Sequence, residues 1–172
     1  MEDSKKYNET LILPQTSFAM RAKLPEKELE TIKFWEDINL WKVLREASKG
    51  REKFILHDGP PYANGPIHMG TAANKILKDI INRTMQMEGF DAEFVPGWDC
   101  HGLPIEWQIE KLYRKKGLNK DKINIKDFRQ ECRDFAAEWI EKQKKSFIRL
   151  FVLADWKNPY LTMDYQAEAI IL

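Results

Sequence analysis

Residues that could do chemistry concentrate in two short loops of the sequence, around 57–71 and 95–104. All three histidines of the chain lie in these loops or at their edges: His57, His68 and His101. Five of the eight glycines and five of the eight prolines are there too: Gly59, Gly65, Gly70, Gly97, Gly102, Pro60, Pro61, Pro66, Pro96 and Pro104. Loops are rich in glycine and proline without any function. The histidines, which change charge near neutral pH, favour a binding site.

The first loop runs directly into a helix predicted to start near Ala72. The free N–H groups and the positive end of such a helix suit a phosphate. His68 could donate a hydrogen bond to a phosphate oxygen, and Gly70 lacks the Cβ that would keep a nucleotide from the backbone. In the alternative interpretation Thr71 is a plain N-cap and His68 a solvated loop residue. The residues alone leave both interpretations open.

The second loop contains Asp99, which has no basic residue near it in sequence. Such a carboxylate either fixes the turn through backbone donors or pairs with the ammonium group of a ligand. Cys100, His101 and Cys132 could suggest a metal, but without a CxxC pair they fall short of a zinc site. The sequence therefore predicts no metal site and favours a buried thiol.

A strand, a helix and a second strand are predicted to position these loops. The apolar run 53–57 predicts a buried strand, and 92–95 a second one. Between them one helical stripe is formed by Ala73, Ile76, Leu77, Ile80, Ile81 and Thr84. This order gives parallel neighbours that bind ligands at the carboxyl ends of their strands, where both loops lie.

The remaining sequence predicts an extended arm over 1–23 and helices elsewhere. One helix begins at Pro25 with an interruption near Asn39, and further helical patterns cover 105–117 and 128–151. The 172 residues carry 28 basic and 27 acidic side chains, so overall charge decides nothing about partners. Residues 111–149, however, hold 13 basic against 6 acidic side chains, which fits either an RNA contact or solvated helix faces. No DNA-binding motif is present.

Two cysteines, no apolar signal at the start and no long apolar segment predict a soluble cytoplasmic protein without a membrane partner.

Two segments resemble the signature regions of isoleucyl-tRNA synthetases, which are class I aminoacyl-tRNA synthetases. Residues 57–71 read HDGPPYANGPIHMGT, followed at 74–79 by NKILKD, and 95–106 read VPGWDCHGLPIE. Similar stretches at 13–22 and 158–164 extend the resemblance to nearly the whole chain. Valyl enzymes usually read PPPNVTG and leucyl enzymes FPYPSG where this chain reads GPPYANG, which favours the isoleucyl family over a valyl- or leucyl-type synthetase.

The resemblance implies an α/β fold, the first half of a class I synthetase Rossmann-like nucleotide-binding domain with a parallel sheet and crossover helices. Residues 1–50 would form the N-terminal arm and helix, and 51–164 the half domain with its helical cover. Residues 165–172 would begin the junction to an editing insertion. The implied partners are isoleucine, ATP with Mg²⁺, and tRNA(Ile).

The resemblance also assigns roles by position. His68, Gly70 and Thr71 would be catalytic and would stabilise the phosphates as charge shifts in the transition state. The nucleotide-binding signature would comprise Pro61, Tyr62, Ala63, Asn64, Gly65, Pro66, Ile67, His68, Met69, Gly70 and Thr71. Substrate-binding residues would be Gly59, Pro60, Asp99 and His101, with Asp99 holding the ammonium group of isoleucine.

Two departures from the family pattern bear on activity. Thr71 stands where the common signature has its second histidine, and its hydroxyl can donate a hydrogen bond but cannot carry positive charge. The KMSKS loop, the editing domain and the anticodon-binding helices have no counterpart here. We therefore expect a truncated amino-terminal fragment that is inactive alone. The alternatives are a nucleotide- or tRNA-binding module without catalysis, and another nucleotidyl-transfer enzyme of the same fold.

Overall fold

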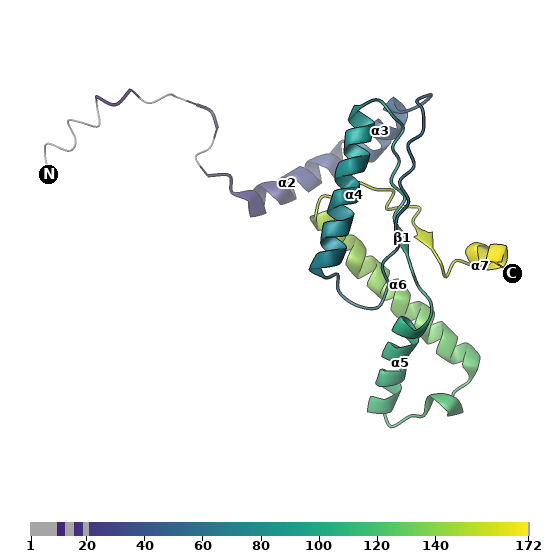
Figure 1. Ribbon diagram of the computed structural model, residues 1–172. Helices are drawn as coiled ribbons and strands as arrows, with labels where there is room; N and C mark the ends of the chain where they lie inside the picture. The colour runs from purple at the N-terminus through teal and green to yellow at the C-terminus, as the bar shows by residue number, and fades with distance from the viewer. Residues whose placement is uncertain (1–9, 13–15, 19–20, 172) are drawn as a thin grey trace, which may run out of the picture.

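A computed structural model describes residues 10–12, 16–18 and 21–171 (Figure 1). Its helices are α2 (Leu24–Asp37), α3 (Leu40–Ala47), α4 (Met69–Met87), α5 (Leu103–Lys115), the 3₁₀ helix η1 (Lys120–Lys122), α6 (Ile125–Arg149) and α7 (Tyr165–Ile171). Its strands are β1 (Gly97–Trp98) and β2 (Tyr160–Leu161). Most of the arm predicted over 1–23 lies outside the described residues.

The predicted interruption near Asn39 is confirmed by the structure. The helix α2 has Pro25 in its first turn, where a missing N–H costs nothing, and it ends at Asp37. Asn39 then adopts a left-handed conformation with φ 48° and precedes α3. Asparagine tolerates this conformation better than most residues, which explains why the helix breaks here.

Three segments of chain run parallel and form the sheet that carries the two loops. The middle segment is 91–99. On one side it pairs with 52–63, through bridges at Lys53–Asp91 and Tyr62–Asp99. On the other side it meets 155–162, including the β1–β2 pair. The parallel direction is as predicted, with α4 as the first crossover and α5 and α6 in the second (Figure 1).

The prediction of regular strands at 53–57 and 92–95 is wrong. Pairing there reduces to the Lys53–Asp91 bridge, and the regular strand pair forms further along, at β1 and β2. Pro60, Pro61 and Pro96 follow these two stretches, and pairing resumes directly after them, at Tyr62 and at Gly97. The sheet is therefore a set of short pairings rather than long strands.

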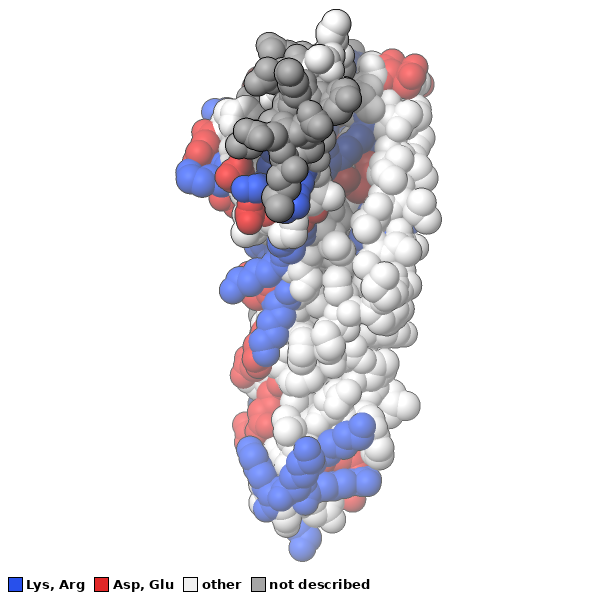
Figure 2. All heavy atoms as spheres, turned by 90° about the vertical axis from the view of Figure 1, so that its left-hand side faces the viewer, with Lys and Arg blue, Asp and Glu red and all other residues white. Residues whose placement is uncertain are grey.

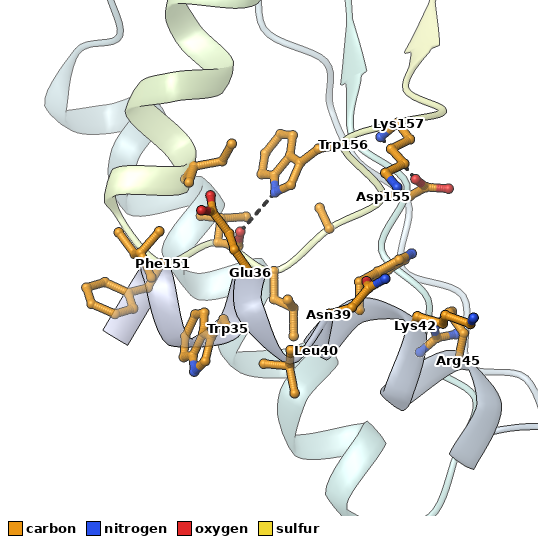
Figure 3. Close-up of a pocket in the computed structure, with 16 residues that line it drawn as sticks. Trp35, Glu36, Asn39, Leu40, Lys42, Arg45, Phe151, Asp155, Trp156 and Lys157 are labelled. Atoms are coloured by element: carbon orange, nitrogen blue, oxygen red, sulfur yellow. Dashed lines mark hydrogen bonds between the residues drawn. The ribbon is translucent and has the colours of Figure 1, made fainter. Parts of the chain in front are cut away.

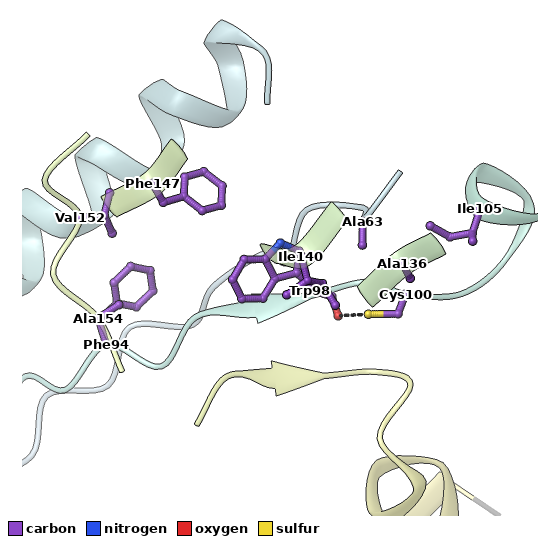
Figure 4. Close-up of a cluster of buried hydrophobic side chains, with 10 residues drawn as sticks. All are labelled: Ala63, Phe94, Trp98, Cys100, Ile105, Ala136, Ile140, Phe147, Val152 and Ala154. Atoms are coloured by element: carbon purple, nitrogen blue, oxygen red, sulfur yellow. Dashed lines mark hydrogen bonds between the residues drawn. The ribbon is translucent and has the colours of Figure 1, made fainter. Parts of the chain in front are cut away.

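The main core lies between this sheet and α6 (Figure 4). Its buried members are Ala63, Phe94, Trp98, Cys100, Ile105, Ala136, Ile140, Phe147, Val152 and Ala154. A smaller cluster of Ile109, Tyr113 and Phe128 packs α5 against α6. Both signature loops contribute to the main core, the first through Ala63 and the second through Trp98 and Cys100. The two loops therefore pack on the same core.

The helix α4 confirms the predicted helix, yet its apolar stripe faces away from the core. The side chains of the stripe are exposed: Ile76 by 37%, Leu77 by 61%, Ile80 by 53% and Ile81 by 42%. The buried positions of this helix are Ala72, Lys75, Asp79 and Asn82, three of them polar. The helix thus presents its polar face to the protein.

Within the described part of the chain, no helix is both long and apolar enough to cross a membrane.

Candidate functional site

The structure brings the two signature loops into direct contact. Ala63 N donates to Asp99 O over 3.0 Å, and Asp99 N donates to Pro61 O over 2.9 Å. These two hydrogen bonds form the parallel bridge between Tyr62 and Asp99. The backbone of Asp99 is therefore fixed to the loop that leads to His68.

The side chain of Gln143, on α6, is hydrogen-bonded to both loops. Its Nε2 donates to the carbonyl oxygens of Tyr62, over 3.0 Å, and of Gly65, over 2.7 Å. Its Oε1 accepts the indole N–H of Trp98 over 2.9 Å. Gln143 is buried, and its bond to Trp98 lies away from water. Sequence reasoning missed this residue because nothing in the pattern of α6 distinguishes it.

His68 is the N-cap of α4. Its Nδ1 accepts the backbone N–H of Thr71 over 3.2 Å, and the helix begins at Met69 rather than near Ala72. The interpretation of Thr71 as the N-cap is therefore wrong, because Thr71 is the residue whose N–H is capped. With Nδ1 accepting, a neutral imidazole carries its proton on Nε2. That nitrogen is then a donor beside the start of a 19-residue helix.

Gly70 is required by the imidazole of His68. A Cβ at position 70 would lie 2.9 Å from Cε1 and 3.0 Å from Nδ1 of His68. Any larger residue would push the ring off the helix end. The closer approach of a nucleotide at Gly70 stays a prediction.

An ion-pair cluster anchors the start of the first loop to α4. Asp58 pairs through Oδ2 with the buried Lys75 and through Oδ1 with Lys78, the latter over 2.6 Å. The ammonium of Lys75 also lies 5.7 Å from the ring centre of Phe94 and 5.6 Å from that of Phe147. Burial lowers the pKa of Lys75, and its hydrogen bond with Asp58 opposes that shift. Sequence reasoning missed the cluster. Its signal was an acid at the start of the loop, Asp58, followed by two lysines about one turn apart on the predicted helix, Lys75 and Lys78.

The carboxylate of Asp99 is half-buried and partly engaged. Its Oδ1 accepts the N–H of His101 over 3.3 Å. This bond fixes the turn through a backbone donor, which is one of the two roles expected for this carboxylate. His101 turns toward the C-terminal segment, where Nε2 donates to Thr162 O over 2.9 Å and lies 3.3 Å from Glu168. Pairing of Asp99 with a ligand ammonium, and contact of His101 with substrate, stay predictions.

A cavity of about 450 Å³ adjoins the second loop. It is lined by Cys100, His101, Gly102, Ile105, Glu106, Phe128, Arg129, Cys132, Arg133, Glu168 and Ile171. Burial raises the pKa of both thiols, that of Cys132 to about 11. Both are therefore protonated at neutral pH, whereas a metal ligand or a nucleophile would be a thiolate. In the described ranges, no three or more His, Cys, Asp or Glu side chains gather as a metal site.

A larger cavity, about 610 Å³, lies elsewhere (Figure 3). It opens between α2, α3 and the segment 148–157, with Trp35, Trp41 and Trp156 in its wall. None of the predicted site residues belongs to its described lining. The candidate site is therefore the edge where the two loops meet, and not this larger cavity.

Comparison with known proteins places these loops in a family. Residues 30–172 match the family model for tRNA synthetases class I (I, L, M and V). Similar curated proteins are isoleucine–tRNA ligases from Agrobacterium fabrum, 62% identical over 165 residues, and Mesorhizobium japonicum, 60% identical over 165 residues. Each match covers 96% of this chain and 17% of the relative. A Brucella abortus isoleucine–tRNA ligase is 57% identical over 173 residues, covering 99% of this chain and 18% of the relative.

A similar fold occurs in the LeuRS of an Agrobacterium radiobacter LeuRS–tRNA–LeuAMS ternary complex. The TM-score is 0.63 at 21% identity, over 86% of this chain and 16% of that one. This supports the predicted half of a class I nucleotide-binding domain. The chain spans about a sixth of the length of the relatives it matches. It belongs to the class I tRNA synthetases of the I, L, M and V group.

Proposed function

We propose that this chain is the amino-terminal part of an isoleucine–tRNA ligase and forms one wall of its amino-acid-activating site. The observation that carries the proposal is 62% identity to such a ligase over 165 residues, a stretch that includes most of the chain. The geometry of the two loops supports it. The start of α4, which suits a phosphate, and the carboxylate of Asp99 belong to loops that are hydrogen-bonded to each other.

In this proposal the phosphates of ATP lie at the start of α4. The N–H groups of Met69 and Gly70 are free of the helix ladder there, and His68 adds its Nε2–H. A carboxylate oxygen of isoleucine forms a bond to the α-phosphorus while the bridging bond to the β-phosphate breaks and pyrophosphate leaves. Donors aimed at the phosphate oxygens stabilise the charge that develops. Mg²⁺ would enter with ATP, whose phosphates supply much of its coordination in such sites.

Thr71 contributes a backbone N–H that keeps His68 in place and a hydroxyl at the third position of the helix. We infer that the remaining members of the signature, residues 61–67, shape the nucleotide side of the loop. Their backbone is held by Gln143 and by Asp99, which supports a rigid rather than a mobile loop. A rigid loop presents its donors without reorganisation when charge develops.

Asp99 would receive the ammonium group of isoleucine through the carboxylate oxygen that does not accept from His101. Gly59 and Pro60 precede the bridged residues and would line the amino-acid pocket. His101 would act from the far side of the same turn, held by Thr162. Discrimination against an amino acid one methylene smaller would reach only about 1–3 kcal/mol in such a pocket, which is why editing is needed elsewhere.

The tRNA(Ile) partner is supported by charge at one end of the molecule. Residues 111–129 carry eight basic and two acidic side chains, although the whole chain is nearly neutral. Figure 2 shows Lys and Arg gathered at the lower end, where α5, η1 and α6 meet in Figure 1. Lys115, Lys116 and Lys122 are exposed there. RNA binding should weaken steeply with salt, and a Lys115→Ala/Lys116→Ala/Lys122→Ala variant should show a smaller salt slope.

A chimera tests the proposed activity. The chain replaces the matched segment of the Agrobacterium fabrum ligase, and isoleucine-dependent exchange of pyrophosphate into ATP is measured. The chimera should activate isoleucine, and Asp99→Asn should remove most of that activity while the turn, which an amide oxygen can still fix, survives. Glu88→Gln, an exposed charge at the far end of α4, is the control and should change nothing. Preference for leucine or valine would show that the isoleucine assignment is wrong.

The 172-residue chain alone should show little or no exchange, since the part of the relatives that it does not match would supply the opposite wall. Strong exchange by the isolated chain, lost in Asp99→Asn, would contradict that expectation. The cytoplasm is the proposed location, as it is where translation supplies tRNA.

A further inference from the structure

The pairing between β1 and β2 ends in an exchange of hydrogen-bond partners at Thr162. Thr162 N donates to Trp98 O over 3.2 Å, which continues the ladder of the two strands. In a regular parallel ladder the next bond would run from Cys100 N to Thr162 O. Instead, Cys100 N donates to the hydroxyl oxygen Oγ1 of Thr162 over 2.8 Å. The side chain of Thr162 therefore takes the place of a backbone carbonyl.

This exchange leaves the carbonyl oxygen of Thr162 for His101. The Nε2 of His101 donates to that oxygen over 2.9 Å, and a carbonyl oxygen can only accept, so this nitrogen carries a proton. Thr162 thus binds the second loop through its N–H, its hydroxyl and its carbonyl. The three partners, Trp98, Cys100 and His101, lie on both sides of Asp99 in the sequence.

Asp99 itself is held from the opposite side. Its N–H and its carbonyl oxygen are bonded to Pro61 and Ala63 of the first loop. The first loop thus fixes where the backbone of Asp99 lies, whereas Thr162 fixes the direction in which the chain leaves it. The turn 99–101, in which Asp99 Oδ1 accepts the N–H of His101, depends on that direction. A change at Thr162 should therefore rotate the carboxylate without displacing the loop.

Arg133, on α6, anchors the segment that follows Thr162. Its Nη1 donates to Met163 O, and its Nη2 pairs with Glu168 on α7. A planar guanidinium can bridge two acceptors in this way, whereas a lysine ammonium is a point charge on a flexible stem. Glu168 in turn lies 3.3 Å from Nε2 of His101. Side chains from α6, α7 and the second loop therefore surround the peptide group that contacts His101.

We infer that Thr162, anchored by Arg133, is a positioning residue that directs the carboxylate of Asp99 toward the ammonium group of the amino-acid substrate. The inference rests on the proposed function, in which Asp99 receives that group. The pair of ammonium and carboxylate is present both before and during the reaction. Misdirecting Asp99 therefore weakens substrate binding and leaves the rate of the bound complex unchanged. ATP, which the proposal places at the start of α4, should bind as before.

The chimera with the remainder of the Agrobacterium fabrum ligase tests the inference through separate KM values for isoleucine and ATP in pyrophosphate exchange. Thr162→Val keeps the shape of the side chain and removes the acceptor. It should raise KM for isoleucine by about 10-fold or more, with kcat and KM for ATP within about 2-fold of wild type. Thr162→Ser restores the hydroxyl and should return KM for isoleucine to within about 3-fold of wild type.

Thr84→Val is the matched control. It removes an exposed hydroxyl that donates to Ile80 O within α4, and it should change neither KM value. A purely structural role of Thr162 would give a different pattern. Partial unfolding of Thr162→Val would lower kcat with the fraction of active molecules and leave both KM values unchanged. That pattern, or any result in which KM for isoleucine stays at the wild-type value, would overturn the inference.

Arg133→Met gives a second measure if Thr162→Val does not fold. It releases Met163 and Glu168 while the hydroxyl of Thr162 stays in place. KM for isoleucine should rise by about 3-fold or more at an unchanged KM for ATP. An Arg133→Met chimera with both KM values of the wild type would overturn the inference.

Hydrogen exchange in the 172-residue chain separates this inference from the proposed function. Thr162→Val should speed exchange of the Cys100 N–H by about 10-fold or more, because that group loses its acceptor. The N–H of Ala63, which is bonded to Asp99 O, should exchange at the wild-type rate. A chimera that activates no amino acid would contradict the proposed function, and these exchange rates would then decide the inference. Equal rates at Cys100 in variant and wild type would overturn it.

Discussion

The indole N–H of Trp98 donates a 2.9 Å hydrogen bond to the side chain of Gln143, which also donates to both Tyr62 and Gly65. One buried amide on α6 thus sets the spacing of two loops that lie far from it in sequence. The site depends on a helix that contains none of the signature residues.

Replacing Gln143 by leucine should lower the free energy of unfolding by about 2–4 kcal/mol, because the buried indole N–H of Trp98 loses its partner at about 1–3 kcal/mol and two partly buried carbonyl oxygens lose a donor. Urea unfolding followed by circular dichroism measures the change. Gln130→Leu, on the exposed face of the same helix, should stay within about 0.5 kcal/mol. A Gln143 variant as stable as the control would show that the loops do not need this clamp.

Gly70→Ala should not give the stabilisation of about 1 kcal/mol by which alanine favours helices over glycine. The new Cβ would lie 2.9 Å from the imidazole of His68 and displace the cap, whose loss costs about 1 kcal/mol on its own. Faster hydrogen exchange at Thr71 N–H reports the loss directly. Gly65→Ala, where a Cβ meets nothing within 4 Å, is the control. Unchanged exchange in Gly70→Ala would argue against the cap.

Asp58→Asn should destabilise the chain by about 3–5 kcal/mol, because it leaves the buried Lys75 without a counter-charge. Lys75→Met should cost less, since Asp58 keeps Lys78 as a partner. The double variant should cost less than the sum of the two, and thermal or urea unfolding gives all three values. Lys33→Met/Asp37→Asn breaks an exposed pair and should change stability by about 0.5 kcal/mol at most. Simple additivity at the buried pair would contradict the coupling.

Stability should fall between about pH 9 and pH 11, partly because of Cys132. Burial raises the pKa of its thiol from 9.0 to about 11, so the unfolded chain loses this proton first and gains relative stability as pH rises. Tyr113, whose pKa burial raises to about 12, acts in the same direction at higher pH. Cys132→Ala should therefore flatten the fall relative to wild type, as urea midpoints at pH 8, 9, 10 and 11 would show. Parallel pH curves for the two proteins would contradict this.

The sequence predicted the direction of the sheet, the helix α4 and the meeting of both loops at one edge. It did not predict where regular pairing forms, because the apolar runs at 53–57 and 92–95 do not show which backbone groups find a partner in a neighbouring segment. Periodicity located the stripe of α4 correctly but says nothing about which side faces the protein.

The inward side of α4 depends on Asp58, Leu153 and Phe94, residues outside the helix, of which Leu153 lies 74 residues from its partner Asp79. Gln143 was invisible for the same reason, since its partners lie 45 to 81 residues away. Which nitrogen of His68 caps the helix depends on the orientation of the ring, which a sequence pattern does not contain. The family resemblance named the residues of the site, and the structure shows which of them hold each other in place.

The aromatic cavity beside α2 gives the chain a natural optical reporter. Three of its six tryptophans, Trp35, Trp41 and Trp156, line that one hollow. Water entering it, or α2 lifting away from Phe151, would shift their emission to longer wavelengths. The emission of these three tryptophans therefore reports the seating of the amino-terminal helices, alongside that of Trp98 in the second loop.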